Sequence, residues 1–315
     1  MAGATAAGAT DAGAAVGSPA SGPVTAPGGP VAAARSRTIP AMDQRTFDTR
    51  ELLITTVLLV GLSRLVEPPL IWLVAVLVLV VVAVAALQLL ALVDPAGETA
   101  GVPIESLLVP AAAAVAVAGA IRLIPVGLWL LPALAAGGLL LGRTLRTEAE
   151  ILGSPTGDAS WARRSVMGGI LVVAFVGFLG VAATVPGGLP DPTGALFASS
   201  GIRLRNLALL AGADGVIAAL LAYRAAALRG TNLREVAWSA LTAGVAVAIA
   251  AAGLRAMALP RLLGPALLVI VFYLWDSIHA TVRSDQRDVR RIWEAILLSV
   301  AALVVIAWSF NAPAS

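Results

Sequence analysis

The sequence contains no cysteine and no lysine, and it has a single histidine among its 315 residues. Without cysteine, neither a disulfide nor a thiolate metal site can form. Without lysine, the phosphate-binding loop of a P-loop ATPase cannot be built. One histidine is too few for a histidine-based zinc site. We therefore expect no metal, no cofactor and no ATPase motif within this chain.

Charge is also scarce. Only 12% of the residues are charged, 59% are hydrophobic, and the mean hydropathy is +0.93. A soluble domain carries about 25% charged residues, so this composition is that of an integral membrane protein. The basic residues are all arginine, which with the richness in Ala, Gly, Val and Pro suggests a GC-rich bacterial genome and a bacterial plasma membrane. The expected partners are the lipid bilayer and other membrane subunits.

The isoelectric point of about 10.4 does not indicate nucleic-acid binding. The net charge is only +3 and no basic run with interleaved aromatic residues occurs, whereas a nucleic-acid interface needs clustered basic residues. Scattered arginines near the ends of apolar segments are typical of membrane proteins, whose cytoplasmic loops are enriched in basic residues.

Residues 1–45 consist mostly of Ala, Gly, Pro, Ser and Thr. Such a segment buries too little apolar surface to offset the loss of chain entropy on folding, so we predict a disordered N-terminal tail. It also lacks the apolar region of a secretory signal. The remainder, 46–315, is predicted to form one transmembrane helical domain.

The apolar segments predict an all-α, polytopic integral membrane helix bundle. A span needs about 20 predominantly apolar residues, and the run 104–142 is too long for one helix, so we expect a turn near 122–125. Residues 143–164 are predicted to form a polar loop. The nine predicted spans are 51–66, 70–93, two within 104–142, 166–185, 204–224, 236–256, 262–279 and 292–310.

The arginines favour nine spans with a cytoplasmic N-terminus and an outer C-terminus. In that topology fifteen arginines lie on the inner side and six on the outer side, as the positive-inside rule predicts. If 51–66 is instead an interfacial helix, eight spans remain and the bias weakens to eleven against ten.

The predicted helix 204–224 carries one carboxylate, Asp214, near its middle. A charge at mid-membrane is unfavourable by roughly 2.5–3.5 kcal/mol, so Asp214 needs a partner, a proton or a water-lined cavity. Its small neighbours would let another helix approach closely. The candidate cations are Arg122, Arg203 and Arg255. Asp214 is either a proton-, cation- or solute-binding group or a structural partner of one arginine.

A second candidate cluster lies at the predicted cytoplasmic end of 262–279. Tyr273, Asp276, His279 and Arg283 follow one another at this end, and spacings of three and four residues place the last three on one helix face. Asp276 could orient His279 as a general base or proton relay. The simpler interpretation is a helix end whose polar groups meet water.

Five residues, Asp214-Gly-Val-Ile-Ala218, resemble the core of the CDP-alcohol phosphotransferase motif. Ala219 stands where that motif has arginine, and the upstream aspartate and the later aspartate pair are missing. The chain is therefore not assigned to that family.

Three functions remain open from the sequence. The leading hypothesis is a transporter of a small solute, ion or lipid, or the membrane subunit of one, that uses Asp214. The alternative is a structural or assembly protein in which Asp214 only fixes helix packing. An intramembrane enzyme is the third, and it would need Asp276 and His279 to converge with another acid such as Glu148. No catalytic residue is assigned.

Overall fold

The computed structural model describes residues 41–67, 70–91, 102–153, 160–189, 202–230, 232–257 and 259–283, with residues 293, 296–301, 304 and 307. Its regular structure there is helical and contains no strand, which confirms the all-α prediction. The helices are α1 Ala41–Ser63, α2 Ile71–Ala91, α3 Glu105–Ala120, the short 3-10 helix η1 Ile121–Leu123, α4 Leu130–Gly153, α5 Ser160–Thr184, α6 Leu204–Ala227, α7 Leu233–Ala256 and α8 Leu263–Arg283.

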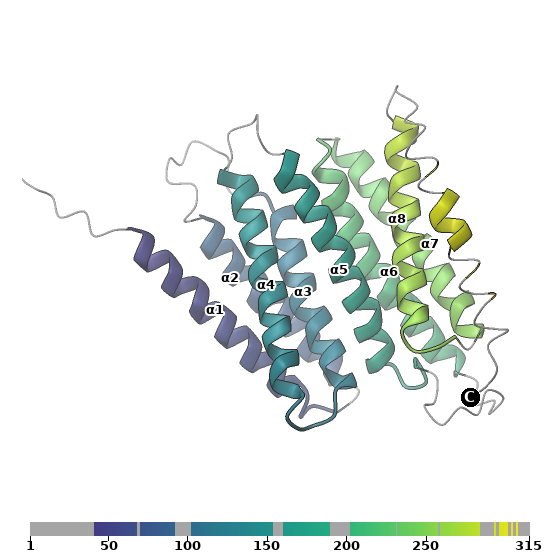
Figure 1. Ribbon diagram of the computed structural model, residues 1–315, viewed down its shortest axis with the longest axis horizontal. Helices are drawn as coiled ribbons and strands as arrows, with labels where there is room; N and C mark the ends of the chain where they lie inside the picture. Colours follow the sequence, from purple (N-terminus) through teal and green to yellow (C-terminus); the bar gives the residue numbers. More distant parts are fainter. Residues whose placement is uncertain are drawn as a thin grey trace, which may run out of the picture. The chain divides into compact units, whose positions relative to one another are not determined.

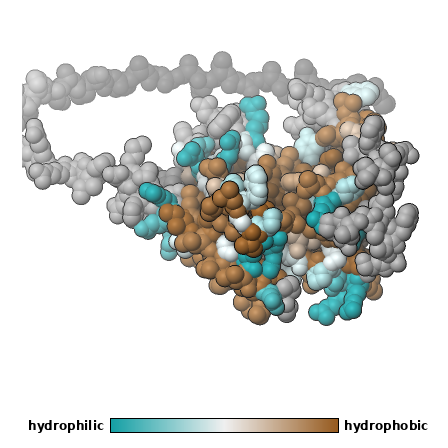
Figure 2. Space-filling view, turned by 60° about the horizontal axis from the view of Figure 1, so that its bottom comes forward, coloured by the Kyte–Doolittle hydropathy of each residue, from teal (hydrophilic) through white to brown (hydrophobic). Residues whose placement is uncertain are grey.

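Five helical segments are long and apolar enough to cross a membrane. They are Ile71–Ala91, Glu105–Leu123, Arg164–Thr184, Leu204–Ala227 and Leu233–Ala256. Figure 2 shows hydrophobic side chains over most of the coloured surface, with hydrophilic ones in separate patches. On α2, for example, Leu73 is 67% exposed and Val76 63%. Such an apolar exterior is suited to contact with lipid. The chain is therefore a membrane-embedded helical protein.

The helices lie side by side and alternate in direction (Figure 1). The α3 helix packs against α2, α5 and α6, and α6 has its most extensive contact with α7. A large buried cluster joins α3, α5, α6, α7 and α8, and a second joins α1, α2, α3 and α4. Because the helices alternate in direction, α6 begins at the end of the bundle where α5 ends, and α8 begins at the end where α7 ends.

Close packing of α6 and α7 depends on two glycines. A Cβ atom added at Gly215 would lie 2.8 Å from the Gly244 carbonyl oxygen, and one added at Gly244 would lie 2.7 Å from the Gly215 carbonyl oxygen. Both distances are shorter than a carbon and an oxygen tolerate, so only glycine lets the two backbones approach this closely. The prediction that small residues around Asp214 allow a close approach is confirmed.

The predicted turn within 104–142 is confirmed. The α3 helix ends at Ala120, η1 follows, and Ile124 is extended. An extended conformation is favoured there because Pro125 disfavours a helical conformation for the preceding residue.

The prediction of a polar loop over 143–164 was wrong. The α4 helix continues to Gly153 and α5 begins at Ser160, so most of the segment is helical. The reason lies in packing, because Leu145, Thr147 and Glu148 on this last part of α4 are buried. A segment that contains several charged residues can still be helical when one face of the helix is buried.

Two further predictions fall largely outside the described residues. Of the predicted disordered tail 1–45, residues 41–45 belong to α1 and the others lie outside the description. The predicted span 292–310 is described only in pieces, of which the longest is the helical stretch 296–301.

Candidate functional site

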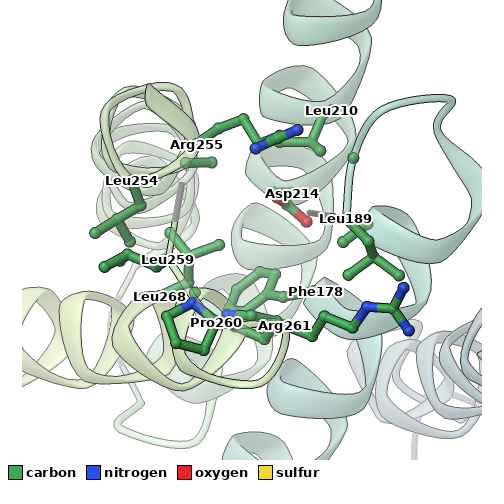
Figure 3. A pocket seen from close by; sticks show the side chains of 15 residues that line it. Phe178, Leu189, Leu210, Asp214, Leu254, Arg255, Leu259, Pro260, Arg261 and Leu268 are labelled. Carbon is green, nitrogen blue, oxygen red and sulfur yellow. The ribbon is translucent and has the colours of Figure 1, made fainter. Parts of the chain in front are cut away.

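A pocket opens among α5, α6, α7 and α8, near the ends of α5 and α7 (Figure 3). We call this end of the helices the pocket end. The empty space in the pocket, its open mouth included, is about 460 Å³. Its walls are mostly apolar, and it is lined by Phe178, Ala182, Gly188, Leu189, Leu210, Asp214, Ala251, Leu254, Arg255, Leu259, Pro260, Arg261, Gly264, Pro265 and Leu268.

Asp214 is the only carboxylate among these lining residues. It is 1% exposed, and in Figure 3 its carboxylate points into the pocket. Its Oδ1 atom is buried and has no hydrogen-bond partner within the described part of the chain. Buried polar atoms are nearly always hydrogen-bonded, and the exceptions call for an explanation such as a water, an ion or a functional role. Asp214 therefore lacks a hydrogen-bond partner that a buried carboxylate oxygen normally has.

Arg255 lines the same pocket, but its side chain is hydrogen-bonded to a group other than Asp214. Its Nε atom donates to the carbonyl oxygen of Gly187, at 2.8 Å. Gly187 has a φ of 79°, a conformation that glycine adopts without steric penalty. In Figure 3 the Arg255 guanidinium lies beside Leu210, which is one helical turn before Asp214. No ion pair between Arg255 and Asp214 is formed in the described structure.

The other two candidate cations lie away from the pocket. Arg203 is exposed at the start of α6. Arg122, in η1, donates through Nη2 to the carbonyl oxygen of Val66, at 2.6 Å, and so holds the end of the segment that follows α1. Of the four residues in the first predicted site, the structure brings only Asp214 and Arg255 to one pocket.

A buried ion pair joins α4 to α6 near the opposite end of these helices. Glu148 is 0% exposed and Arg224 4% exposed. Arg224 Nε donates to Glu148 Oε1 at 3.1 Å, and Nη2 donates to Oε2, so the contact is bidentate. The sequence did not indicate this pair, because Glu148 lies in the segment that was predicted to be a loop. A local signal was present in Leu145 and Leu152, which lie three residues before and four residues after Glu148 and so share its helix face.

Asp276, from the second predicted site, forms another ion pair. Its Oδ1 atom accepts from Arg229 Nη2, and Arg229 Nε also donates to the Ala225 carbonyl oxygen, at 3.1 Å. This links α8 to the turn that follows α6. We call the region of these two ion pairs the ion-pair end.

His279 does not use Asp276 in this structure. Its Nδ1 atom lies 3.2 Å from the Trp275 carbonyl oxygen, and its ring centroid is 4.9 Å from that of Trp275. Tyr273 is half-buried, and the side chain of Arg283 lies outside the described residues.

The geometry limits the chemistry that the site offers. Glu148 and Asp276 each face a different arginine, so they do not converge with His279 as the enzyme hypothesis requires. Within the described residues no three acidic or histidine side chains come together as a metal site. What remains is a small, mostly apolar pocket with one unpartnered carboxylate and arginine at its wall. No protein-family model, curated protein or solved structure matches this chain.

Proposed function

We propose that this chain is a transporter of a small solute, or the membrane subunit of one, and that Asp214 is its solute-binding acid. The supporting observation is the buried carboxylate that lines a pocket without a hydrogen-bond partner among the described residues. Ionisable residues in membrane helices pair with one another or face a cavity, and one without a partner is a candidate functional group. A group kept only for helix packing would be expected to have its partner in the protein.

The topology that goes with this proposal has nine spans, with the N-terminus in the cytoplasm of a bacterial cell and the C-terminus outside. The arginine distribution supports it, with fifteen on the inner side and six on the outer side. The pocket end of α6 then faces outward and the ion-pair end faces the cytoplasm.

A transport cycle would require the ion-pair end to open. At that end of the bundle the pairs Glu148–Arg224 and Asp276–Arg229 connect α4 and α8 to α6 and its following turn. Alternating access works by rocking one group of helices against another around a fixed site. Release into the cytoplasm would therefore separate α6 and α7 from α4 and α8 and break these contacts.

The alternative function is a structural or assembly protein. The buried pair Glu148–Arg224 and the close contact of Gly215 with Gly244 support it, because both fix helix packing. The two proposals differ in the role of Asp214. The transport function uses its carboxylate to bind a solute, and the structural function does not explain why the carboxylate is there.

Uptake into liposomes tests the proposal. Purified full-length protein is reconstituted, and a mixed panel of amino acids, amines, carboxylates and sugars is offered outside. The solutes retained inside are then quantified by mass spectrometry. We expect the wild type to accumulate at least one solute above empty liposomes, and Asp214→Asn to reduce that accumulation at least tenfold with an unchanged melting temperature.

Glu235→Gln is the matched control, because it also removes one carboxylate but at the N-terminal cap of α7. It should keep the wild-type uptake. If no solute accumulates, or if Asp214→Asn mainly reduces the yield of folded protein, the structural function is the better account.

A further inference from the structure

An acidic and a basic side chain line the pocket without pairing with each other. The Asp214 carboxylate points into the space, and Arg255 lines the same pocket with its guanidinium beside Leu210 (Figure 3). An ionised carboxylate and a guanidinium that line one pocket attract each other, yet Arg255 donates to the Gly187 carbonyl instead.

A simple cation fits this arrangement poorly. Arg255 lines the pocket, and a positive charge at the wall of a pocket lowers the local concentration of cations. A simple anion fits poorly too, because an ionised Asp214 would repel it at the bottom of the pocket. A molecule that carries both charges would meet both groups favourably.

We infer that the pocket binds a small zwitterion whose ammonium group contacts Asp214 and whose acid group contacts Arg255. This inference rests on the proposed function and names its substrate class. The ammonium supplies the donors that the Asp214 Oδ1 atom lacks. The guanidinium supplies a planar set of donors suited to a carboxylate or phosphate.

The remaining wall residues determine which groups of the ligand can lie beside its two charges. Phe178, Leu254 and Leu268 present apolar surface to the pocket, so an apolar substituent on the zwitterion would be buried favourably. Two sources offer this chemistry. One is a free amino acid with an aliphatic side chain, and the other is the headgroup of a phosphatidylethanolamine lipid.

Thermal unfolding of the full-length protein in detergent micelles distinguishes the ligands. The probes are L-alanine, L-leucine, L-leucinamide, which lacks the acid charge, and 4-methylpentanoate, which lacks the amine. A ligand present at tenfold its dissociation constant should raise the melting temperature by roughly 3 °C or more. We expect this shift with an amino acid and less than a third of it with the singly charged analogues at the same concentration.

The lipid arm uses nanodiscs of phosphatidylethanolamine with phosphatidylglycerol, compared with phosphatidylglycerol alone. Stabilisation by the zwitterionic lipid, without a response to the amino acids, would assign the site to the headgroup and uphold the inference. Asp214→Asn and Arg255→Gln should each abolish the response. Arg203→Gln should keep it, because Arg203 is an exposed arginine at the same end of α6 that does not line the pocket.

Three outcomes overturn the inference. They are a full response to L-leucinamide or to 4-methylpentanoate, an unchanged response in Asp214→Asn, and no response to any zwitterion. A full response to L-leucinamide that Asp214→Asn abolishes would leave the proposed transport function in place with a cationic solute. Failure of the uptake experiment, in contrast, removes the transport function whatever binds in the pocket.

Discussion

Glu148, Asp214 and Asp276 are the buried carboxylates of the described residues, and the two least exposed of them differ in what surrounds them. Glu148 on α4 and Asp214 on α6 are 0% and 1% exposed. Glu148 faces a guanidinium through two hydrogen bonds, whereas the Oδ1 atom of Asp214 has no partner in the described structure. Burial alone therefore does not separate these two acids. The presence or absence of a partner from the protein does.

The same contrast separates the two ends of α6. Asp214 lies ten residues before Arg224, about 15 Å along the helix axis. Near Arg224 the helix is connected to its neighbours by charged pairs, and near Asp214 it borders a pocket. If the two ends have these different tasks, removal of charge at each end should have different consequences for stability.

The largest effect is expected from Arg224→Leu. The substitution leaves the Glu148 carboxylate buried and unpaired, which typically destabilises a protein by about 3–5 kcal/mol. The free energy of unfolding can be measured by titrating the folded protein in mild detergent with sodium dodecyl sulfate. The double variant Glu148→Leu with Arg224→Leu should recover most of the loss, because apolar residues of similar size can replace a buried ion pair. A loss below about 1 kcal/mol in the single variant would contradict this account.

The next effect concerns the contact that holds α6 beside α7. Gly215→Leu places side-chain atoms where Gly244 lies, so we expect a loss of about 1–3 kcal/mol from overpacking. Gly212→Ala, on the same helix, is the control, since a Cβ atom added there has nothing within 4 Å. It should be neutral or stabilise the helix by up to about 1 kcal/mol. Equal losses in both variants, in the same titration, would rule out the close contact as the cause.

Much of this fold follows from the sequence, because a membrane helix must satisfy its backbone internally and therefore shows as a long apolar run. The positions of α2, α5, α6 and α7 were predicted to within a few residues, except that α5 begins earlier, at Ser160. Asp214 was found for the same reason, since a lone charge in such a run is conspicuous.

The partners were harder to predict than the helices. Glu148 and Arg224 are 76 residues apart in the chain, and each lies near charged residues that look like a helix end or a loop. No local pattern shows that two such residues meet. Likewise Arg122 and Arg255 looked equivalent as cations for Asp214, and only the packing of η1 and α7 assigns them to different places. Pairing between distant helices is a property of tertiary packing, and a single sequence does not encode it in any local spacing.

A smaller effect is expected at the second ion pair. Arg229→Gln removes the partner of Asp276, but the Arg229 side chain is 28% exposed, so water can replace part of the interaction. We expect a loss of about 1 kcal/mol, near the upper range for exposed pairs. Arg234→Gln, at an exposed position near the start of α7, is the control and should change the free energy of unfolding by less than about 0.5 kcal/mol. A loss as large as that of Arg224→Leu would contradict the expectation that water replaces part of the interaction of Arg229 with Asp276.

The smallest effect is expected from Asp214→Asn, and it tests the difference between Asp214 and Glu148 most directly. The substitution keeps the shape of the side chain and removes no hydrogen bond that the described structure forms, so the free energy of unfolding should change by less than about 0.5 kcal/mol. Glu148→Gln is its counterpart, an equally conservative change that takes the charge from the buried pair and leaves Arg224 uncompensated. We expect it to lose several kcal/mol. Measured side by side, similar losses would mean that Asp214 is a packing residue like Glu148. A loss confined to Glu148→Gln would mean that the protein keeps the Asp214 carboxylate for something other than its own stability.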